Sequence, residues 1–248
     1  MKRKKTGPIE FALEDHLLWI VEKQISAHFV SQTLKKVVRF VKLPVGMIVP
    51  DLVLVATRAN SRSPKRSSRV PSLFECEILA TLLKRGPLER STLARLLYTR
   101  ETSLERAVLR LVRDKLLRVN RAGALVVRKD AFPSKIKIVS FEAKLRRWKD
   151  AIRQAKEYHR FSNHSYVALP KSVVDGNQQL QKACRRERVG LIAVSANKTE
   201  HVLATKNVKP ITAERIWLIQ KVAALQKTPR RPSNGYEAPT TSKNRSKA

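Results

Sequence analysis

Three residues in two short segments have the types and spacing needed for metal-dependent phosphate chemistry. Asp51 follows Pro50 at the start of an apolar run, and Glu142-Ala143-Lys144 closes another. In a β-strand, residues i and i+2 point to the same side, so Glu142 and Lys144 face the same way. If the two strands are neighbours, Asp51 meets this pair at one edge of a sheet.

The chemistry that this trio suggests is hydrolysis of a phosphodiester bond. Carboxylate oxygens suit Mg²⁺, which takes only one or two protein carboxylates when a phosphate and waters supply the remaining ligands. Such an ion activates a water and offsets charge on the leaving oxygen. A lysine beside it orients the attacking water or stabilises the charge on the phosphate. Asp51, Glu142 and Lys144 therefore predict a catalytic site with Mg²⁺, or Mn²⁺, as cofactor.

The order of these residues resembles the PD-(D/E)xK superfamily of nucleases, which includes restriction endonucleases, Holliday-junction resolvases and the RecB-type nucleases. Gln154 and Tyr158 resemble the QxxxY motif of the RecB-type branch. Their spacing places both on one face of the helix that follows the second strand. The resemblance implies catalytic roles for Gln154 and Tyr158 as well. It also implies an α/β fold of the restriction-endonuclease-like kind, with a mixed sheet flanked by helices.

The same resemblance implies that an acidic residue on the first helix completes the metal site with Asp51 and Glu142. Glu14 is our candidate, and Glu10 is close behind. Each site residue also has a structural interpretation. Asp51 would cap a turn, Glu142 and Lys144 would form an ion pair at the strand edge, and Tyr158 would pack in the core. Gln154 would lie on a polar face, and Glu14 would be a surface charge near the helix N-terminus.

The sequence departs from the family in the distance between its two motifs. The family usually joins them by a short connection, whereas 91 positions separate Asp51 from Glu142. We expect an insertion here, with a polar basic linker over 59–70 and a separate module over 71–134. Periodic apolar residues predict three helices over 72–84, 88–97 and 103–116. Ser72 is a possible N-cap of the first, and a β-hairpin over 117–127 follows the third.

Three helices followed by a hairpin resemble a winged helix-turn-helix domain, whose third helix enters the major groove of DNA. Arginines on the outer face of that helix suit guanine edges and phosphates, and those in the wing suit backbone phosphates. The predicted DNA contacts are Ser103, Arg106, Arg110 and Arg113 on the third helix, Arg118, Arg121 and Arg128 in the wing, and Arg146 and Arg147 beside the catalytic site. Two other interpretations of this module remain, a protein-contact surface and a solvated basic face.

The remaining residues predict a discontinuous core over 1–58 and 135–227, and a disordered basic tail over 228–248. Strands are expected at 36–40, 52–55, 136–143, 166–169, 190–194 and 201–204, and helices at 9–27, 146–161, 173–186 and 213–226. Strands that alternate with helices favour parallel pairing in an α/β layer. The two cysteines, Cys76 and Cys184, fall at apolar helix positions and are expected to be buried free thiols.

The charge of the chain points to nucleic acid as its partner. The formal net charge is +32, from 52 Lys and Arg against 20 Asp and Glu, and a surface this basic attracts polyanions. The sequence contains no apolar run long enough to span a membrane, and its basic start is not followed by the apolar stretch of a signal peptide. We therefore expect a cytoplasmic, nucleoid-associated protein that binds double-stranded DNA, and a homodimer is possible.

Three functions are compatible with these features. The first is a Mg²⁺-dependent DNA endonuclease whose winged helix holds the duplex. The second is a non-catalytic DNA-binding regulator or architectural protein with a decayed nuclease core. Asp51, Glu142 and Lys144 are all present, and this favours the first because decay usually removes one of them. A third and weaker possibility is binding of RNA or branched DNA.

Overall fold

A computed structural model describes residues 11, 13–29, 36–57, 69–133 and 136–225. Glu10, most of the expected linker and the expected tail lie outside these residues. In the described residues, no helix combines the length and the apolar character needed to cross a membrane. Cys76 and Cys184 are buried free thiols, as expected.

A six-stranded mixed sheet forms the larger part of the fold, in the order β1-β2-β5-β6-β7-β8. The first three strands pair antiparallel, β5, β6 and β7 pair parallel, and β8 returns antiparallel to β7. The strands are β1 Lys36–Val41, β2 Leu52–Thr57, β5 Ile136–Ala143, β6 His164–Pro170, β7 Gly190–Ser195 and β8 Lys198–Leu203. The expected α/β class with a mixed sheet flanked by helices is confirmed at this level.

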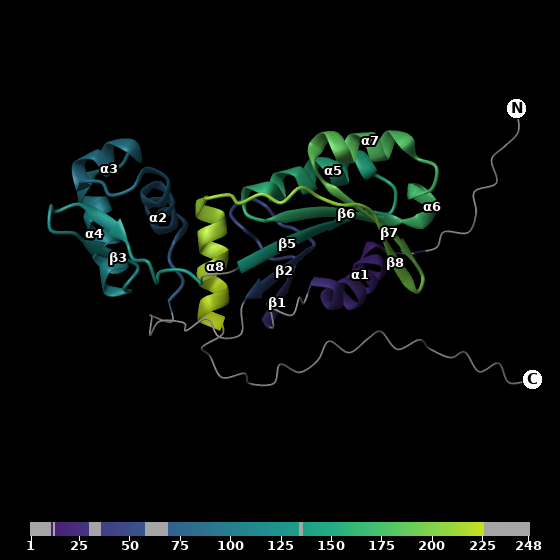
Figure 1. The fold of residues 1–248 in the computed structure, drawn as a ribbon, viewed down its shortest axis with the longest axis horizontal. Helices are drawn as coiled ribbons and strands as arrows, with labels where there is room; N and C mark the ends of the chain where they lie inside the picture. The colour runs from purple at the N-terminus through teal and green to yellow at the C-terminus, as the bar shows by residue number, and fades with distance from the viewer. Residues whose placement is uncertain (1–10, 12, 30–35, 58–68, 134–135, 226–248) are drawn as a thin grey trace, which may run out of the picture.

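Helices cover both faces of the sheet, because alternate side chains of its inner strands are apolar on each side. Helix α1 (Glu14–Phe29) lies on one face, where it packs against Leu54 and Phe141. Helices α5 (Trp148–Glu157), α6 (Lys171–Val174) and α7 (Gln178–Glu187) lie on the other, against Val55 and Ile138 (Figure 1). Both faces of β2 and β5 are therefore buried, and only the strand ends are open to a polar site.

A second unit with its own apolar core occupies the chain between β2 and β5. It contains α2 (Leu73–Arg85), α3 (Arg90–Leu96), α4 (Glu101–Arg113) and the hairpin of β3 (Leu117–Val119) with β4 (Leu125–Val127). Ser72 caps α2, accepting a hydrogen bond from the Glu75 N–H while the Glu75 carboxylate accepts one from the Ser72 N–H. Because β2 and β5 are neighbours in the sheet, this unit is an insertion between two paired strands.

Helix α8 (Ala213–Leu225) joins the two units, standing between them in Figure 1. Ile216 belongs to the core of the inserted unit. Leu218 and Val222 belong instead to the core between the sheet and helices α5, α6 and α7. Gln220 donates a hydrogen bond of 3.1 Å from its Nε2 to the carbonyl oxygen of Ala131. The last helix, which the sequence placed in the sheet domain alone, thus contributes to both cores.

Several expected helix boundaries were wrong. The first helix begins at Glu14 rather than at residue 9, and Leu13 precedes it and is exposed. The helix expected over 173–186 is broken into α6 and α7, because Gly176 adopts a φ of 70° and Asn177 caps α7. Helix α5 ends at Glu157, and a 3₁₀ turn, Tyr158–Arg160, follows it. Helix α4 begins at Glu101, two residues before the expected start, and ends at Arg113, three residues before the expected end.

Candidate functional site

Asp51 lies beside the end of β5, at the edge of the sheet where β2 begins. The register pairs Leu52 with Phe141, which places Asp51 opposite Glu142. One carboxylate oxygen of Asp51, Oδ2, accepts a hydrogen bond of 2.8 Å from the backbone N–H of Ala143. The Asp51 carbonyl oxygen accepts a bond of 3.0 Å from the N–H of Lys42. The first bond holds Asp51 against the Glu142–Lys144 segment, and the second ties it to the residue that follows β1.

Glu142 and Lys144 form an ion pair at this edge. The Nζ of Lys144 lies 2.8 Å from Glu142 Oε1 and 3.4 Å from Glu14 Oε2. The second oxygen of Glu142, Oε2, accepts a hydrogen bond from the Tyr158 hydroxyl. Glu142 is only 1% exposed. The structure therefore brings five of the predicted site residues together, namely Glu14, Asp51, Glu142, Lys144 and Tyr158.

The electrostatics of the site come from carboxylates that are crowded and poorly hydrated. Burial, and next the negative charge of Asp51, raise the pKa of Glu142 above its ordinary value. Burial also raises the pKa of Asp51, and the charge of Glu14 adds to the effect. Burial is the largest single influence on Lys144 and lowers its pKa, but the hydrogen bond to Glu142 and the negative charges of Glu142, Asp51 and Glu14 together outweigh it and raise the pKa of Lys144. A site of this kind favours additional positive charge.

Gln154 stands apart from this cluster. It lies on α5, about one helical turn before Tyr158. Its Oε1 atom is buried without a hydrogen-bond partner among the described residues. Within the same part of the chain, no hydrogen bond joins Gln154 to Asp51, Glu142 or Lys144. An unsatisfied buried amide oxygen costs free energy in the absence of a ligand or an ordered water. Gln154 thus remains a predicted site residue with an acceptor atom to spare.

The donor atoms present fit Mg²⁺ better than a softer metal. Among the residues described, no group of three or more His, Cys, Asp or Glu side chains is arranged to hold a metal ion. Glu14, predicted as the third ligand, is held instead by the ammonium group of Lys144. The carboxylates of Asp51 and Glu142 remain, and two carboxylates with waters and a phosphate are what Mg²⁺ ordinarily takes.

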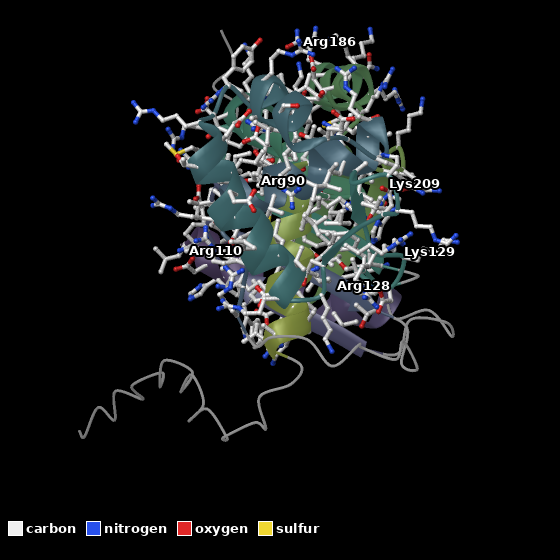
Figure 2. All side chains as sticks on the ribbon, turned by 90° about the vertical axis from the view of Figure 1, so that its left-hand side faces the viewer. Arg90, Arg110, Arg128, Lys129, Arg186 and Lys209 are labelled. Atoms are coloured by element: carbon white, nitrogen blue, oxygen red, sulfur yellow. The ribbon has the colours of Figure 1, made fainter. Side chains whose placement is uncertain are left out.

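The predicted DNA-contacting residues lie mainly on the surface of the inserted unit. Figure 2 looks onto this unit and shows basic side chains spread over it, including Arg90, Arg110, Arg128 and Lys129. The exposed members of the predicted set are Ser103, Arg106, Arg110 and Arg113 on α4, Arg118 and Arg121 in the hairpin, and Arg146 and Arg147 before α5. Arg128 forms an ion pair with Asp130, and Arg147 forms one with Asp150, at 3.1 and 3.7 Å.

Arg110 has a structural role that the sequence did not reveal. Its Nε lies 2.6 Å from Oε1 of Glu75, a carboxylate with no exposed surface. Arg69 lies 2.7 Å from the other Glu75 oxygen and also pairs with Asp114. Burial alone would raise the pKa of Glu75, but the hydrogen bonds from Arg69 and Arg110 lower it to about 2. Arg110 therefore joins α4 to α2, although its side chain is still 43% exposed.

The partners of Glu75 could not be read from the pattern that identified Ser72. A serine followed three residues later by glutamate indicates a capping box, which the structure contains. The same carboxylate then binds Arg69 and Arg110, one of them 35 positions away.

No protein-family model, curated protein or solved structure matches this chain. The interpretation of both sites consequently depends on their geometry and chemistry.

Proposed function

We propose that this chain is a metal-dependent DNA endonuclease with a restriction-endonuclease-like core. The observation that carries the proposal is the meeting of Asp51, Glu142 and Lys144 at one sheet edge. Asp51 is bonded to the Ala143 N–H at 2.8 Å, and Lys144 is bonded to Glu142 at 2.8 Å. Such convergence of residues so distant in the chain is what the resemblance to the PD-(D/E)xK superfamily requires.

Each residue has a role that its surroundings support. Asp51 and Glu142 would hold a divalent cation, Mg²⁺ or Mn²⁺, and their mutual repulsion favours binding of positive charge. When bound, that ion would supply an activated water and charge for the leaving oxygen. Lys144 holds a proton next to the reacting phosphate and orients the attacking water. Tyr158 fixes one oxygen of Glu142, which leaves the carboxylate a single orientation.

The inserted unit is proposed to be a winged helix-turn-helix domain that holds duplex DNA. Its three helices and hairpin have the order of that domain, and α4 presents Ser103, Arg106 and Arg113 to the surface. The net charge of +32 supports a polyanionic partner. Cutting both strands with one site per chain would require two copies, so a homodimer on DNA and a nucleoid-associated, cytoplasmic location belong to the same proposal.

A non-catalytic DNA-binding protein with a decayed nuclease core is the second candidate. The ammonium group of Lys144 lies between Glu14 and Glu142, and among the described residues no three acidic, His or Cys side chains are arranged to hold a metal ion. A regulator or architectural protein would retain such an ion pair for stability alone. The two candidates differ in whether a divalent cation binds at the sheet edge and whether DNA is cut.

Two measurements on the purified full-length chain test the proposal. Supercoiled, linear and branched DNA are incubated with Mg²⁺ or with chelator, using wild type, Asp51→Asn and Glu142→Gln. Mg²⁺-dependent cleavage by wild type alone is expected. Thermal unfolding with and without Mg²⁺ provides the second readout, because a ligand that binds only the folded state raises the Tm. Equal cleavage by Glu142→Gln, or no cleavage of any substrate, would overturn the enzymatic assignment.

A further inference from the structure

Tyr98, in the turn between α3 and α4, combines a strained backbone with an exposed aromatic ring. Its side chain is 98% exposed, and its φ is 49°, in the left-handed region that residues other than glycine seldom adopt. Bulky side chains are disfavoured there, and a ring that remains in water gains no packing in return. Neither the backbone nor the core explains a tyrosine at this position.

The hydrogen bonds around Tyr98 show that it occupies the position after a helix where glycine is usual. The Tyr98 N–H donates to the carbonyl of Arg95 at 3.2 Å, and the Thr99 N–H donates to that of Ala94 at 3.1 Å. Lys115 and Arg188 hold the equivalent left-handed positions after α4 and α7. Their positive charges are favourable beside helix carbonyls, an advantage that tyrosine lacks.

The surroundings of Tyr98 are basic and open. Arg95 and Arg100 flank it in sequence, and Ser103 and Arg106 follow on the outer face of α4; all four are exposed. An aromatic ring among arginines is the arrangement with which proteins bind single-stranded nucleic acid, because the cations hold phosphates and the ring stacks on a base. A base offers the ring a flat surface on which it can stack and leave water. Bases in an intact duplex present their edges rather than their faces to the grooves.

We propose that Tyr98 stacks on an unpaired DNA base, and that the preferred DNA is a duplex interrupted by a single-stranded gap or flap. This inference rests on the proposed function and names the class of DNA on which that function acts. Arg95 and Arg100 contact the phosphates on either side of the unpaired base, and α4 contacts the adjoining duplex. Tyr98 thus selects for DNA structure, whereas the arginines contribute affinity for any DNA.

The test compares the affinity of the full-length protein for two DNAs of the same sequence, one intact and one with a short gap, in chelator so that neither is cut. Wild type should bind the gapped DNA more tightly. Tyr98→Phe retains the ring and should keep this preference. Tyr98→Asn tolerates the left-handed backbone without a ring, and it should lose about tenfold in affinity for gapped DNA while its affinity for intact duplex is unchanged. Ile211→Ala, another exposed apolar position, is the control.

Each outcome of this comparison is decisive. Absence of a gap preference in wild type, equal loss on both DNAs, or no loss in Tyr98→Asn overturns the inference. Thermal unfolding should show Tyr98→Asn to be at least as stable as wild type, so an affinity loss is not a loss of fold. Mg²⁺-dependent cleavage by Tyr98→Asn without any gap preference in wild type would leave the proposed nuclease standing and refute the role of Tyr98. A gap preference that depends on Tyr98, in a protein that cuts no DNA, would support the role of Tyr98 and refute the proposed nuclease.

Discussion

The carboxylate of Asp51 accepts a hydrogen bond of 2.8 Å from the backbone N–H of Ala143, 92 positions away in the chain. Ala143 lies between Glu142 and Lys144, whose side chains meet at 2.8 Å. The bond therefore fixes the two candidate catalytic segments relative to each other without the help of a ligand. Its geometry depends on the antiparallel register of β2 with β5, so any shift of that register would separate the three residues.

Lys144 offers the cleanest test of the proposed chemistry. In Lys144→Gln, the cleavage rate should fall about 100-fold, because a group that stabilises charge in the transition state is lost. The affinity for DNA should change little, since one positive charge of many is removed. Both are measured by cleavage kinetics and by titration of DNA in chelator. Lys182→Gln, at an exposed position on α7, is the matched control and should cut normally.

Arg110 and Arg106 are neighbours on α4 and should respond differently to substitution by alanine. Arg110→Ala leaves one oxygen of the buried Glu75 carboxylate without a partner, and we expect a loss of about 2 kcal/mol in the free energy of unfolding. Arg106 is exposed, so Arg106→Ala should change stability by less than about 0.5 kcal/mol while it weakens DNA binding. Urea unfolding beside DNA titration separates the two. Equal stability of both variants would refute the structural role of Arg110.

Acid should destabilise the inserted unit through Glu75. Its pKa is lowered from 4.5 to about 2, so the folded state holds the ionised form more firmly than the unfolded state does. The stability that this contributes is complete above pH 4.5 and is lost as the pH falls towards 2. Glu75→Gln should consequently be less stable than wild type by about 2 kcal/mol at pH 7, with the gap closing near pH 2. Urea unfolding of both proteins across this pH range measures the difference in stability. A difference that does not change with pH would contradict the prediction.

Gly190, at the start of β7, is required for close packing rather than for an unusual backbone angle. A Cβ at this position would lie 2.3 Å from Cδ1 of the Tyr166 ring and 3.1 Å from the Leu203 carbonyl oxygen. Gly190→Ala should cost about 3 kcal/mol in the free energy of unfolding, because the ring must move within a filled core. Gly176→Ala meets open space and has only an unfavourable φ of 70°, which should cost about 1 kcal/mol. Thermal unfolding of the two variants would reveal the difference.

Much of the fold can be predicted from local patterns along the chain. The apolar strands, the N-cap at Ser72 and the hairpin all depend on neighbours within a few residues, and the structure confirms them. The shared orientation of Glu142 and Lys144 follows from the two-residue period of a strand in the same way. Where local patterns conflict, as at Gly176 within the helix expected over 173–186, the sequence was misread because one glycine outweighed the helical periodicity.

Contacts between distant segments could not be predicted in this way. Nothing near Asp51 reveals that β2 pairs with β5, and nothing near Arg110 reveals that it binds a carboxylate on another helix rather than pointing freely outward. These contacts arise because the sheet must bury both faces of its central strands and because the buried Glu75 requires partners. The residues that could act were visible in the chain, but their neighbours were set by burial and charge in the folded molecule.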